Sequence, residues 1–233
     1  MSKGQPKAAD WLLYACRTPY ADEIVEIIWR TGGTAAVFVD NLPDPPASRL
    51  GPIVRPADLT AAQRQLPALI PLITPGHRYE VEAEARALGF ARFPALIDPS
   101  AIVARTADIG EGSVVNAQAM IGAHALLGRF VHVNRSVSIG HDARIEDYVT
   151  MGPGCVLAGQ VTLETGCFVG AGAILGPNVR VGANAIVGVG AVVLHSIPPN
   201  VTVIGNPARI VRTQSTGYGG AAVPVAARKI FSL

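Results

Sequence analysis

The chain has 233 residues, of which 49% are hydrophobic and only 15% charged, and its formal net charge is +2. This length allows two modest domains, the small charge gives no reason to expect nucleic-acid binding, and no uncharged apolar run is long enough to span a membrane. The N-terminal residues show no basic segment followed by an apolar stretch, so a secretory signal is not expected. Three cysteines without a metal-binding pattern fit a reducing compartment, and we expect a cytoplasmic protein without a metal site.

The first 95 residues predict a small α/β domain. Apolar, strand-like runs alternate with helical patterns, and one of these helices places Ile24, Ile27 and Ile28 on a single apolar face. This order of elements is typical of a βαβ opening and predicts a three-stranded, Rossmann-like domain over residues 1–95. The expected elements are strands at 11–15, 35–39 and 69–74 and helices at 20–30 and 80–88.

A six-residue repeat fills residues 97–198. Seventeen consecutive blocks each begin with a large apolar residue, such as Ile97 or Val103, and carry a small or branched residue at the fifth place, such as Ala101. A helix would need apolar residues at a spacing of 3.6, and a flat strand would alternate with a period of two. A period of six fits a triangular solenoid, in which each block supplies one strand and one corner and three blocks complete a coil. We expect a parallel β-helix of between five and six coils over residues 96–213.

Residues 214–233 follow the repeat as a C-terminal tail. Its glycines at 217–220 predict a flexible stretch, and the apolar segment 223–233 is expected to dock, over the cofactor groove if there is one. The last 35 residues hold four basic and no acidic residues. This basic segment either contacts the phosphates of an anionic cofactor or is a solvated tail.

The order of these parts resembles a known family. Residues 89–103 read GFARFPALIDPSAIV, the repeat runs without interruption, and residues 205–209 close it with GNPAR. Over roughly residues 11–212 the chain resembles the NeuD/PglD-type bacterial sugar acetyltransferases. The resemblance implies a left-handed β-helix that forms a homotrimer, with acetyl-CoA between two subunits and the acceptor sugar on the N-terminal domain.

The catalytic candidate is His141, followed by Asp142, in a block phase that faces outward. Acetyl transfer from a thioester needs a base near neutral pH, and imidazole suits that task. A carboxylate on the other ring nitrogen would fix the tautomer. Neighbours on a regular strand face opposite ways, so Asp142 reaches His141 only if the backbone turns there. The pair matches the family's catalytic histidine and the acid that follows it.

The remaining histidines of the repeat compete poorly for a catalytic role. His124, His132 and His195 share neither one direction nor one coil level with His141. The zinc hydration enzymes built on similar prisms need three histidines that converge on one metal. We therefore expect no metal-dependent chemistry.

The resemblance implies further residues of the site. A backbone N–H at Gly159, in the next coil, would meet the oxyanion that forms on the thioester. Thr150 stands where the family often has a histidine beside the cofactor. The implied cofactor-binding residues are Thr150, Ala171 and Val189 along the pantetheine arm and Arg209 and Arg212 at the phosphates.

The turn after the first predicted strand departs from the family. Family members have a Gly-rich turn there, whose N–H groups hold nucleotide phosphates. In this chain residues 15–20 read ACRTPY, without glycine and with Pro19, which has no N–H. Either Arg17 replaces those donors, or the acceptor is not a nucleotide sugar. The candidate acceptor-binding residues are Arg17, Asp40, Asn41 and Gly51, with His77 and Arg78 expected after the third strand, at the carboxyl edge of the sheet.

Two functions remain open on the sequence. The first is an acyl-CoA-dependent N- or O-acyltransferase, with acetyl-CoA as donor and His141 as general base, acting on an amino sugar, nucleotide sugar or related acceptor. The second is a non-catalytic trimeric β-helix that serves as a binding or scaffold protein. The His141–Asp142 pair favours the first, and the missing Gly-rich turn keeps the second open.

Overall fold

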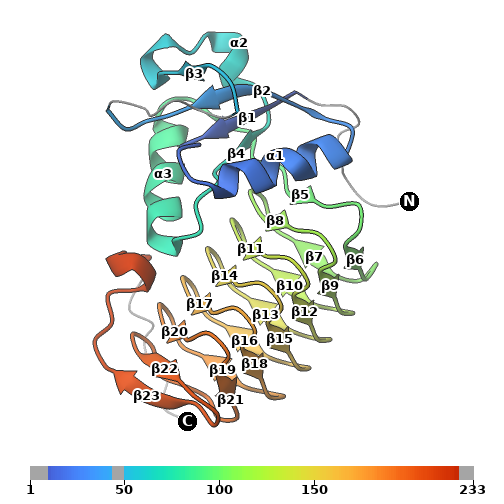
Figure 1. Ribbon diagram of the computed structural model, residues 1–233, viewed down its shortest axis with the longest axis vertical. Coiled ribbons are helices and arrows are strands. Elements are labelled where there is room, and N and C mark those ends of the chain that lie inside the picture. Colours follow the sequence, from blue (N-terminus) through green and yellow to red (C-terminus); the bar gives the residue numbers. More distant parts are fainter. Residues whose placement is uncertain (1–9, 44–49, 226–233) are drawn as a thin grey trace.

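The computed structural model describes residues 10–43 and 50–225 as an α/β unit stacked on one end of a triangular β-prism (Figure 1). The coils of the prism are stacked along its long axis, which is vertical in the figure. The last described segment turns back from the far end of the prism and runs up toward helix α3. The two halves of the chain therefore touch along the prism as well as at its end.

The N-terminal unit is a four-stranded parallel sheet in the order β3-β2-β1-β4, with helices packed against it. The strands and helices expected at 11–15, 35–39 and 20–30 are confirmed. The elements are β1 (Asp10–Tyr14), α1 (Tyr20–Arg30), β2 (Thr34–Val39), β3 (Ile53–Val54), a 3₁₀ turn (Pro56–Asp58), α2 (Ala61–Arg64), β4 (Ala68–Leu69) and α3 (Pro75–Ala87).

Three expectations for this unit are wrong. The sheet has a fourth strand, β3, which pairs with β2 at the edge of the sheet. The strand expected at 69–74 is only the two-residue β4, and the following residues lead into a helix. That helix, α3, begins at Pro75 rather than at residue 80, because proline has the backbone angle of a first helical residue and needs no hydrogen bond there.

The repeat forms seventeen two-residue strands, β5 to β21, one in every six residues, as expected. They stack as three parallel sheets, which are the faces of the prism. The covered face, beneath the N-terminal unit, holds β5 (Leu96–Ile97), β8 (Val114–Val115), β11 (His132–Val133), β14 (Thr150–Met151), β17 (Phe168–Val169) and β20 (Ile186–Val187). The apolar face holds β6 (Ile102–Val103), β9 (Met120–Ile121), β12 (Ser138–Ile139), β15 (Val156–Leu157), β18 (Ile174–Leu175) and β21 (Val192–Val193). The polar face holds β7 (Asp108–Ile109), β10 (Leu126–Leu127), β13 (Arg144–Ile145), β16 (Thr162–Leu163) and β19 (Arg180–Val181).

Three corners join these faces in each coil. The chain passes from the covered to the apolar face at the first corner, for example at 134–137, and from the apolar to the polar face at the second corner, for example at 140–143. The third corner, for example at 146–149, leads back to the covered face. The first residue of each strand points outward and the second points into the core, which the small fifth-place residues complete, including the buried Cys155 and Cys167.

Polar contacts hold the N-terminal unit on the covered face. The Arg78 guanidinium, in the first turn of α3, donates to the carbonyl oxygens of Phe130 and Tyr148 at the third corner, at 2.9 and 2.7 Å. At the first corner Arg135 pairs with Glu23 of α1. Arg78 is fully buried, and hydrogen bonds from charged groups are among the stronger ones in proteins, so its bonds fix the unit at the third corner. The Arg135–Glu23 pair is about half exposed and adds less.

The C-terminal segment also lies on the covered face. After β22 (Thr202–Ile204) and β23 (Arg209–Arg212), a 3₁₀ turn at Tyr218–Gly220 stacks the Tyr218 ring on Phe168 with centroids 3.5 Å apart. Val223 is buried. Its N–H donates to Oδ1 of Asn184, and its carbonyl oxygen accepts from Nδ2 of the same side chain. The structure thus differs from the flexible stretch expected at 217–220, because aromatic stacking holds it. The end of the predicted docking segment, 226–233, lies outside the described residues.

Candidate active site

The second corner of the third coil carries His141 and Asp142. The backbone turns there, since Asp142 has a positive φ of 57°, and the turn brings the carboxylate back onto its neighbour. Oδ2 of Asp142 lies 2.7 Å from Nδ1 of His141. A carboxylate can only accept, so this contact puts the proton on Nδ1 and leaves Nε2 with its lone pair. The imidazole side chain is 65% exposed, and its free nitrogen is open to a reactant.

Gly159, one coil further along the same corner, lies directly against this imidazole. A Cβ built on Gly159 would come within 2.5 Å of Nε2 of His141, closer than any real contact allows. The ring therefore occupies the space that a side chain at 159 would fill. The Gly159 N–H donates to no acceptor among the described residues, whereas the next N–H, that of Gln160, bonds the His141 carbonyl at 2.8 Å. A free N–H beside the base is suited to stabilise an oxyanion.

The residues expected along the cofactor do not share this corner. Ala171 and Val189 lie on the first corner, at the opposite edge of the apolar face, and Val189 is 78% exposed. Arg209 and Arg212 are exposed on β23, at the far end of the prism. Because the apolar face separates the two corners, a single chain does not bring His141 together with Ala171 or Val189.

Two predicted ligand contacts have structural roles instead. Thr150 is buried on the covered face, where its hydroxyl donates to the Ile73 carbonyl at 2.7 Å and accepts from Arg78 at 3.0 Å. Arg78 itself is fully buried. Neither side chain reaches a surface open to a ligand, so the expectation that Thr150 binds the cofactor and Arg78 the acceptor does not fit their burial.

Three of the other acceptor candidates gather at the carboxyl edge of the N-terminal sheet. Arg17 is paired with the buried Asp40, Nε to Oδ2 at 2.8 Å, and Nη2 donates to the Pro43 carbonyl at 2.9 Å. The Asn41 amide donates to Glu84 at 2.7 Å. Gly51 does not lie at this edge, because it precedes the parallel strand β3 and so lies toward its amino end. His77 is exposed in the first turn of α3 rather than in a loop after a strand.

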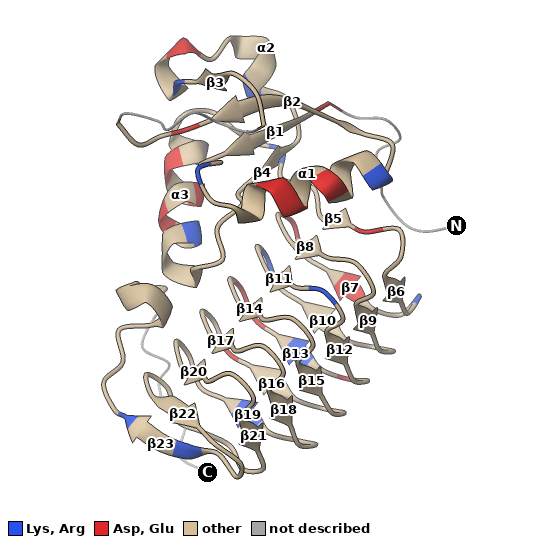
Figure 2. Cartoon of the chain, viewed as in Figure 1, with Lys and Arg blue, Asp and Glu red and all other residues tan. Residues whose placement is uncertain are grey.

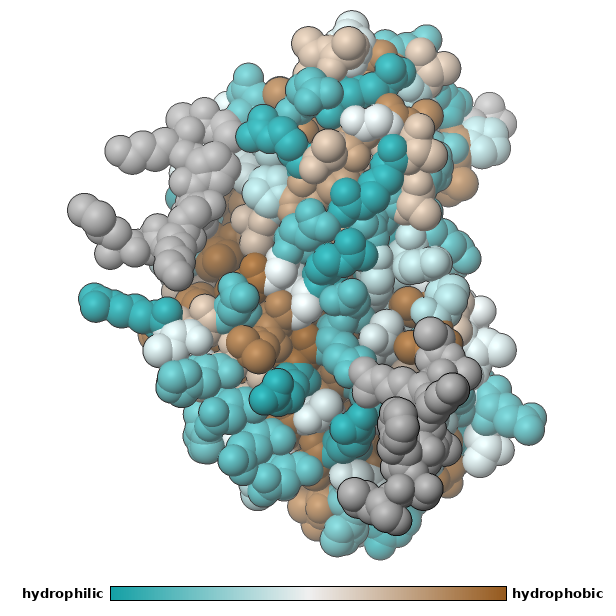
Figure 3. Space-filling view, turned by 180° about the vertical axis from the view of Figure 1, so that it is seen from behind, coloured by the Kyte–Doolittle hydropathy of each residue, from teal (hydrophilic) through white to brown (hydrophobic). Residues whose placement is uncertain are grey.

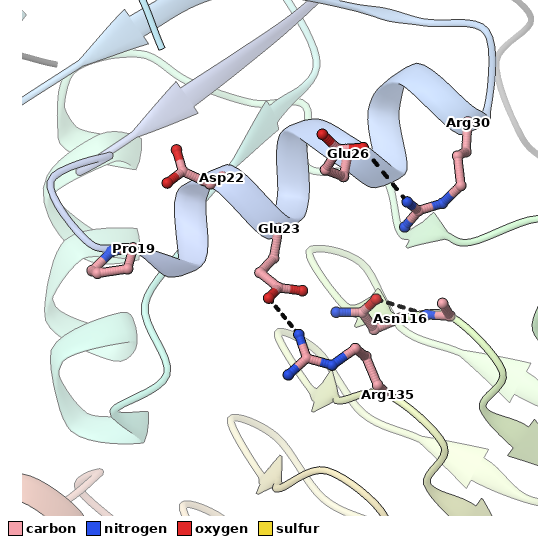
Figure 4. Close-up of a pocket in the computed structure, with 8 residues that line it drawn as sticks. Pro19, Asp22, Glu23, Glu26, Arg30, Asn116 and Arg135 are labelled. Carbon is pink, nitrogen blue, oxygen red and sulfur yellow. Dashed lines mark hydrogen bonds and ion pairs between the residues drawn. The ribbon is translucent and has the colours of Figure 1, made fainter. Parts of the chain in front are cut away.

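A pocket that the sequence did not predict lies between α1 and the first corner (Figure 4). Its volume is about 380 Å³. Three carboxylates and one arginine of α1 face an arginine and an asparagine of the prism across it. The lining residues are Pro19, Asp22, Glu23, Glu26, Arg30, Asn116, Ala117 and Arg135. The acidic spacing in α1 was visible in the sequence, but its partner residues are about a hundred positions away.

Neither a metal centre nor a membrane span is found in the described part of the chain. Within residues 10–43 and 50–225 no three His, Cys, Asp or Glu side chains are grouped so that they could hold a metal ion. None of the helices described there is long and apolar enough to cross a bilayer. The buried His132 stands apart from the other histidines, and burial, followed by the nearby Arg78, holds its pKa well below the usual range.

No family model and no curated protein matches the chain. Solved structures do match it. Perosamine N-acetyltransferase from Caulobacter crescentus, as an H141N mutant in complex with CoA and GDP-perosamine, is 30% identical, with a TM-score of 0.79 over 88% of this chain and 97% of that one. The acetyltransferase domain of PglB from Neisseria gonorrhoeae FA1090, in complex with acetyl coenzyme A, is 28% identical, with a TM-score of 0.79 over 88% of this chain and all of the other, 100%.

The 88% of the chain that each of them covers includes residues of both halves, and one is a perosamine N-acetyltransferase and the other an acetyltransferase domain. A third structure, WeeI from Acinetobacter baumannii AYE, is 24% identical and has a TM-score of 0.75, which supports the fold. With a hexapeptide repeat of seventeen strands, a His–Asp pair on the prism corner and near full-length similarity to these enzymes, the chain belongs to the left-handed β-helix family of hexapeptide-repeat sugar acetyltransferases.

Proposed function

We propose that this protein transfers the acetyl group of acetyl-CoA to the amine of an amino sugar, with His141 as general base. The observation that carries the proposal is the geometry of the second corner, where Asp142 orients His141 and Gly159 offers a free N–H beside it. Relatives with CoA or acetyl coenzyme A bound support the donor, and the perosamine enzyme supports an amino-sugar acceptor. Variants of that enzyme with a histidine replaced by asparagine or alanine are consistent with a catalytic histidine.

The chemistry follows from these groups. Nε2 of His141 takes a proton from the acceptor amine as its nitrogen attacks the thioester carbonyl, and a C–N bond forms. The charge that develops on the carbonyl oxygen is met by the Gly159 N–H. Collapse of this intermediate breaks the C–S bond, and the imidazolium, stabilised by Asp142, returns its proton to the departing thiolate. An N-acetyl sugar and free CoA leave.

The proposed assembly is a homotrimer packed through the apolar face. Four of its outward residues are exposed and apolar, namely Ile102, Met120, Val156 and Ile174, and they are stacked by the parallel register of β6, β9, β15 and β18. The polar face instead presents Asp108, Arg144 and Arg180, and the N-terminal unit lies on the third face. Seen from behind, hydrophobic side chains are exposed on the prism below the N-terminal unit (Figure 3). Exposed apolar area of this kind is removed from water when copies associate.

Packing of three apolar faces around one axis would complete the site. The second corner of one chain then adjoins the first corner of the next, so His141 of one subunit faces Ala171 and Val189 of its neighbour. The cofactor would run in this groove, with Arg209 and Arg212 near its phosphates. Residues 1–95, a Rossmann-like unit, would supply acceptor contacts, residues 96–213 the catalytic prism, and residues 214–233 a tail that braces the covered face.

The experiment is a thiol-release assay with acetyl-CoA and a panel of amino sugars. We expect CoA release that depends on the acceptor, together with an acetylated sugar by mass spectrometry. If the protein binds acetyl-CoA but releases no CoA above the rate of spontaneous hydrolysis with any acceptor, the non-catalytic scaffold becomes the better account.

A further inference from the structure

At the carboxyl edge of the sheet, where parallel α/β sheets commonly bind ligands, the Arg17 side chain is already paired within the chain. Arg17 is the one cation in the turn at residues 15–20. Its Nε donates to Asp40, and its Nη2 donates to the carbonyls of Leu42 and Pro43. At the start of α1, the N–H groups of Ala21 and Asp22 donate to the carbonyls of Thr18 and Pro19, at 2.9 and 3.3 Å. The Arg17 side chain and these two N–H groups of α1 therefore already have partners within the chain.

The charge at this end of α1 also opposes an anion. Asp22 and Glu23 lie in its first turn, and Figure 2 shows this acidic half of the helix in red, with Arg30 in blue at the other end. Carboxylates stabilise a helix N-terminus because they meet its positive dipole end. A phosphate would compete with two of them for the same end of the helix.

The pocket under α1, in contrast, favours a cation. Arg135 is paired with Glu23, and Arg30 with Asp98 at 2.6 Å and with Glu26 at 3.7 Å, as Figure 4 shows for the Glu23 and Glu26 pairs. The Asp22 side chain has no ion pair or hydrogen bond within the described residues. The arginines are therefore compensated, and one carboxylate at the pocket wall is available for a cation.

Buried polar atoms at the floor of the pocket lack partners. Asn116 is 1% exposed; its Oδ1 accepts from the Ala117 N–H at 2.7 Å, but its Nδ2 has no partner. The hydroxyl of Tyr20, on the first turn of α1, does not line the pocket; it is buried next to the Asn116 side chain and has no hydrogen bond of good geometry. A buried donor without an acceptor is costly. A ligand with hydroxyl or ring oxygens would supply the missing acceptor to the Asn116 amide and, together with its amine on Asp22, would use the pocket fully.

The pocket also lies where the reaction would need it. Asn116 and Arg135 both belong to the first corner. Arg135 is in the same coil as His141, and Asn116 is in the coil before it. In the trimer described above, that corner adjoins the second corner of the neighbouring subunit. We propose that the pocket between α1 and the first corner binds the acceptor, and that this acceptor is an amino sugar that carries no nucleoside diphosphate. The inference rests on the proposed acetyltransferase function and narrows its substrate.

The first test compares matched acceptors. Perosamine and other amino sugars are each offered free and as the nucleoside diphosphate, with acetyl-CoA and thiol detection. We expect the best kcat/KM for a free sugar, because the nucleotide adds negative charge beside the carboxylates of α1 and the Arg17 side chain is already paired. Turnover confined to nucleotide-linked sugars, or faster with them, would overturn this inference and leave the acetyltransferase function standing. No turnover with any acceptor would remove the function and this inference together.

The second test removes the unpartnered amide. In Asn116→Ala we expect the KM for the free sugar to rise by about 3- to 30-fold, the range for loss of one hydrogen bond to a ligand, with the KM for acetyl-CoA unchanged. Asn134→Ala is the matched control, because Asn134 occupies the same place one coil later and its Oδ1 also accepts from the next N–H, at 2.8 Å, but it does not line the pocket. Equal acceptor KM values in the two variants, with both folded as judged by melting temperature, would place the acceptor elsewhere.

Discussion

The two corners that border the apolar face differ in the groups that they carry. The second corner holds the exposed pair His141–Asp142, packed against Gly159. The first corner holds the exposed Val189 and, under α1, a pocket lined by Asn116 and Arg135. The second corner thus carries an imidazole with a free nitrogen, and the first corner borders the pocket under α1.

This difference fits the proposal that the active site forms between two subunits. Within one chain a strand of the apolar face lies between the two corners in every coil, so the two corners are at opposite edges of that face. The apolar side chains on that face give the chain a reason to associate, and a threefold arrangement sets unlike corners side by side. Catalysis would then depend on the oligomer rather than on the monomer.

Disruption of the apolar face should have the largest effect. In Ile174→Lys a charge replaces an outward side chain that is 47% exposed in the single chain. We expect a chain that sediments as a 24.2 kDa monomer and has lost activity by about a thousandfold or more, because it loses the groove itself.

Leu126→Lys is the matched control for this change, since Leu126 is 43% exposed on the polar face. It should keep the native mass and turnover. A monomeric Ile174→Lys protein with full activity would show that one corner works alone.

The next largest loss of activity is expected from removal of the base. His141→Ala is expected to lower kcat by about 10²–10⁴-fold, the usual range for a general base, and to leave the mass and melting temperature unchanged because the side chain is exposed. Asp142→Asn should cost less, since it removes orientation and charge stabilisation but keeps the base. Near-normal turnover in His141→Ala would mean that another group takes the proton.

A smaller loss is expected from Gly159→Ala. The added Cβ would overlap Nε2 of His141, so the ring has to move by a fraction of an ångström or more, which typically costs about 10–100-fold in kcat. The N–H is kept. If the loss is due to this displacement, the same substitution in a His141→Ala background should add nothing further, and an additive loss would contradict the steric explanation.

The smallest effect concerns the covered face. Burial and then Arg78 hold the pKa of His132 well below its ordinary value, so the unfolded chain binds a proton that the folded chain does not. Stability should then fall as pH drops below about 6.5, by up to about 1.4 kcal/mol per pH unit. In His132→Phe, which keeps the stacking on Tyr20, urea unfolding between pH 7 and 5.5 should show a shallower slope. An unchanged slope would assign the acid sensitivity to other groups.

The sequence was most informative where structure is local. The period of six predicted every strand of the prism, and the adjacent His141 and Asp142 predicted their own contact, because both depend on residues within one coil. The roles of Thr150 and Arg78 could not be read in this way, since they meet across 72 residues. The pocket was missed for the same reason, as α1 and Asn116 approach only when the N-terminal unit is seated on the prism.

Subunit mixing tests the central claim most directly. His141→Ala is impaired at the second corner, and Ala171→Trp would block the groove at the first corner, so each homotrimer should be nearly inactive. In trimers co-expressed from equal amounts of the two chains, about one quarter of the sites would pair an intact second corner with an intact first corner from the neighbour. The account predicts recovery to about that fraction of wild-type activity. Mixed trimers as inactive as their parents would show that each site is built within a single chain.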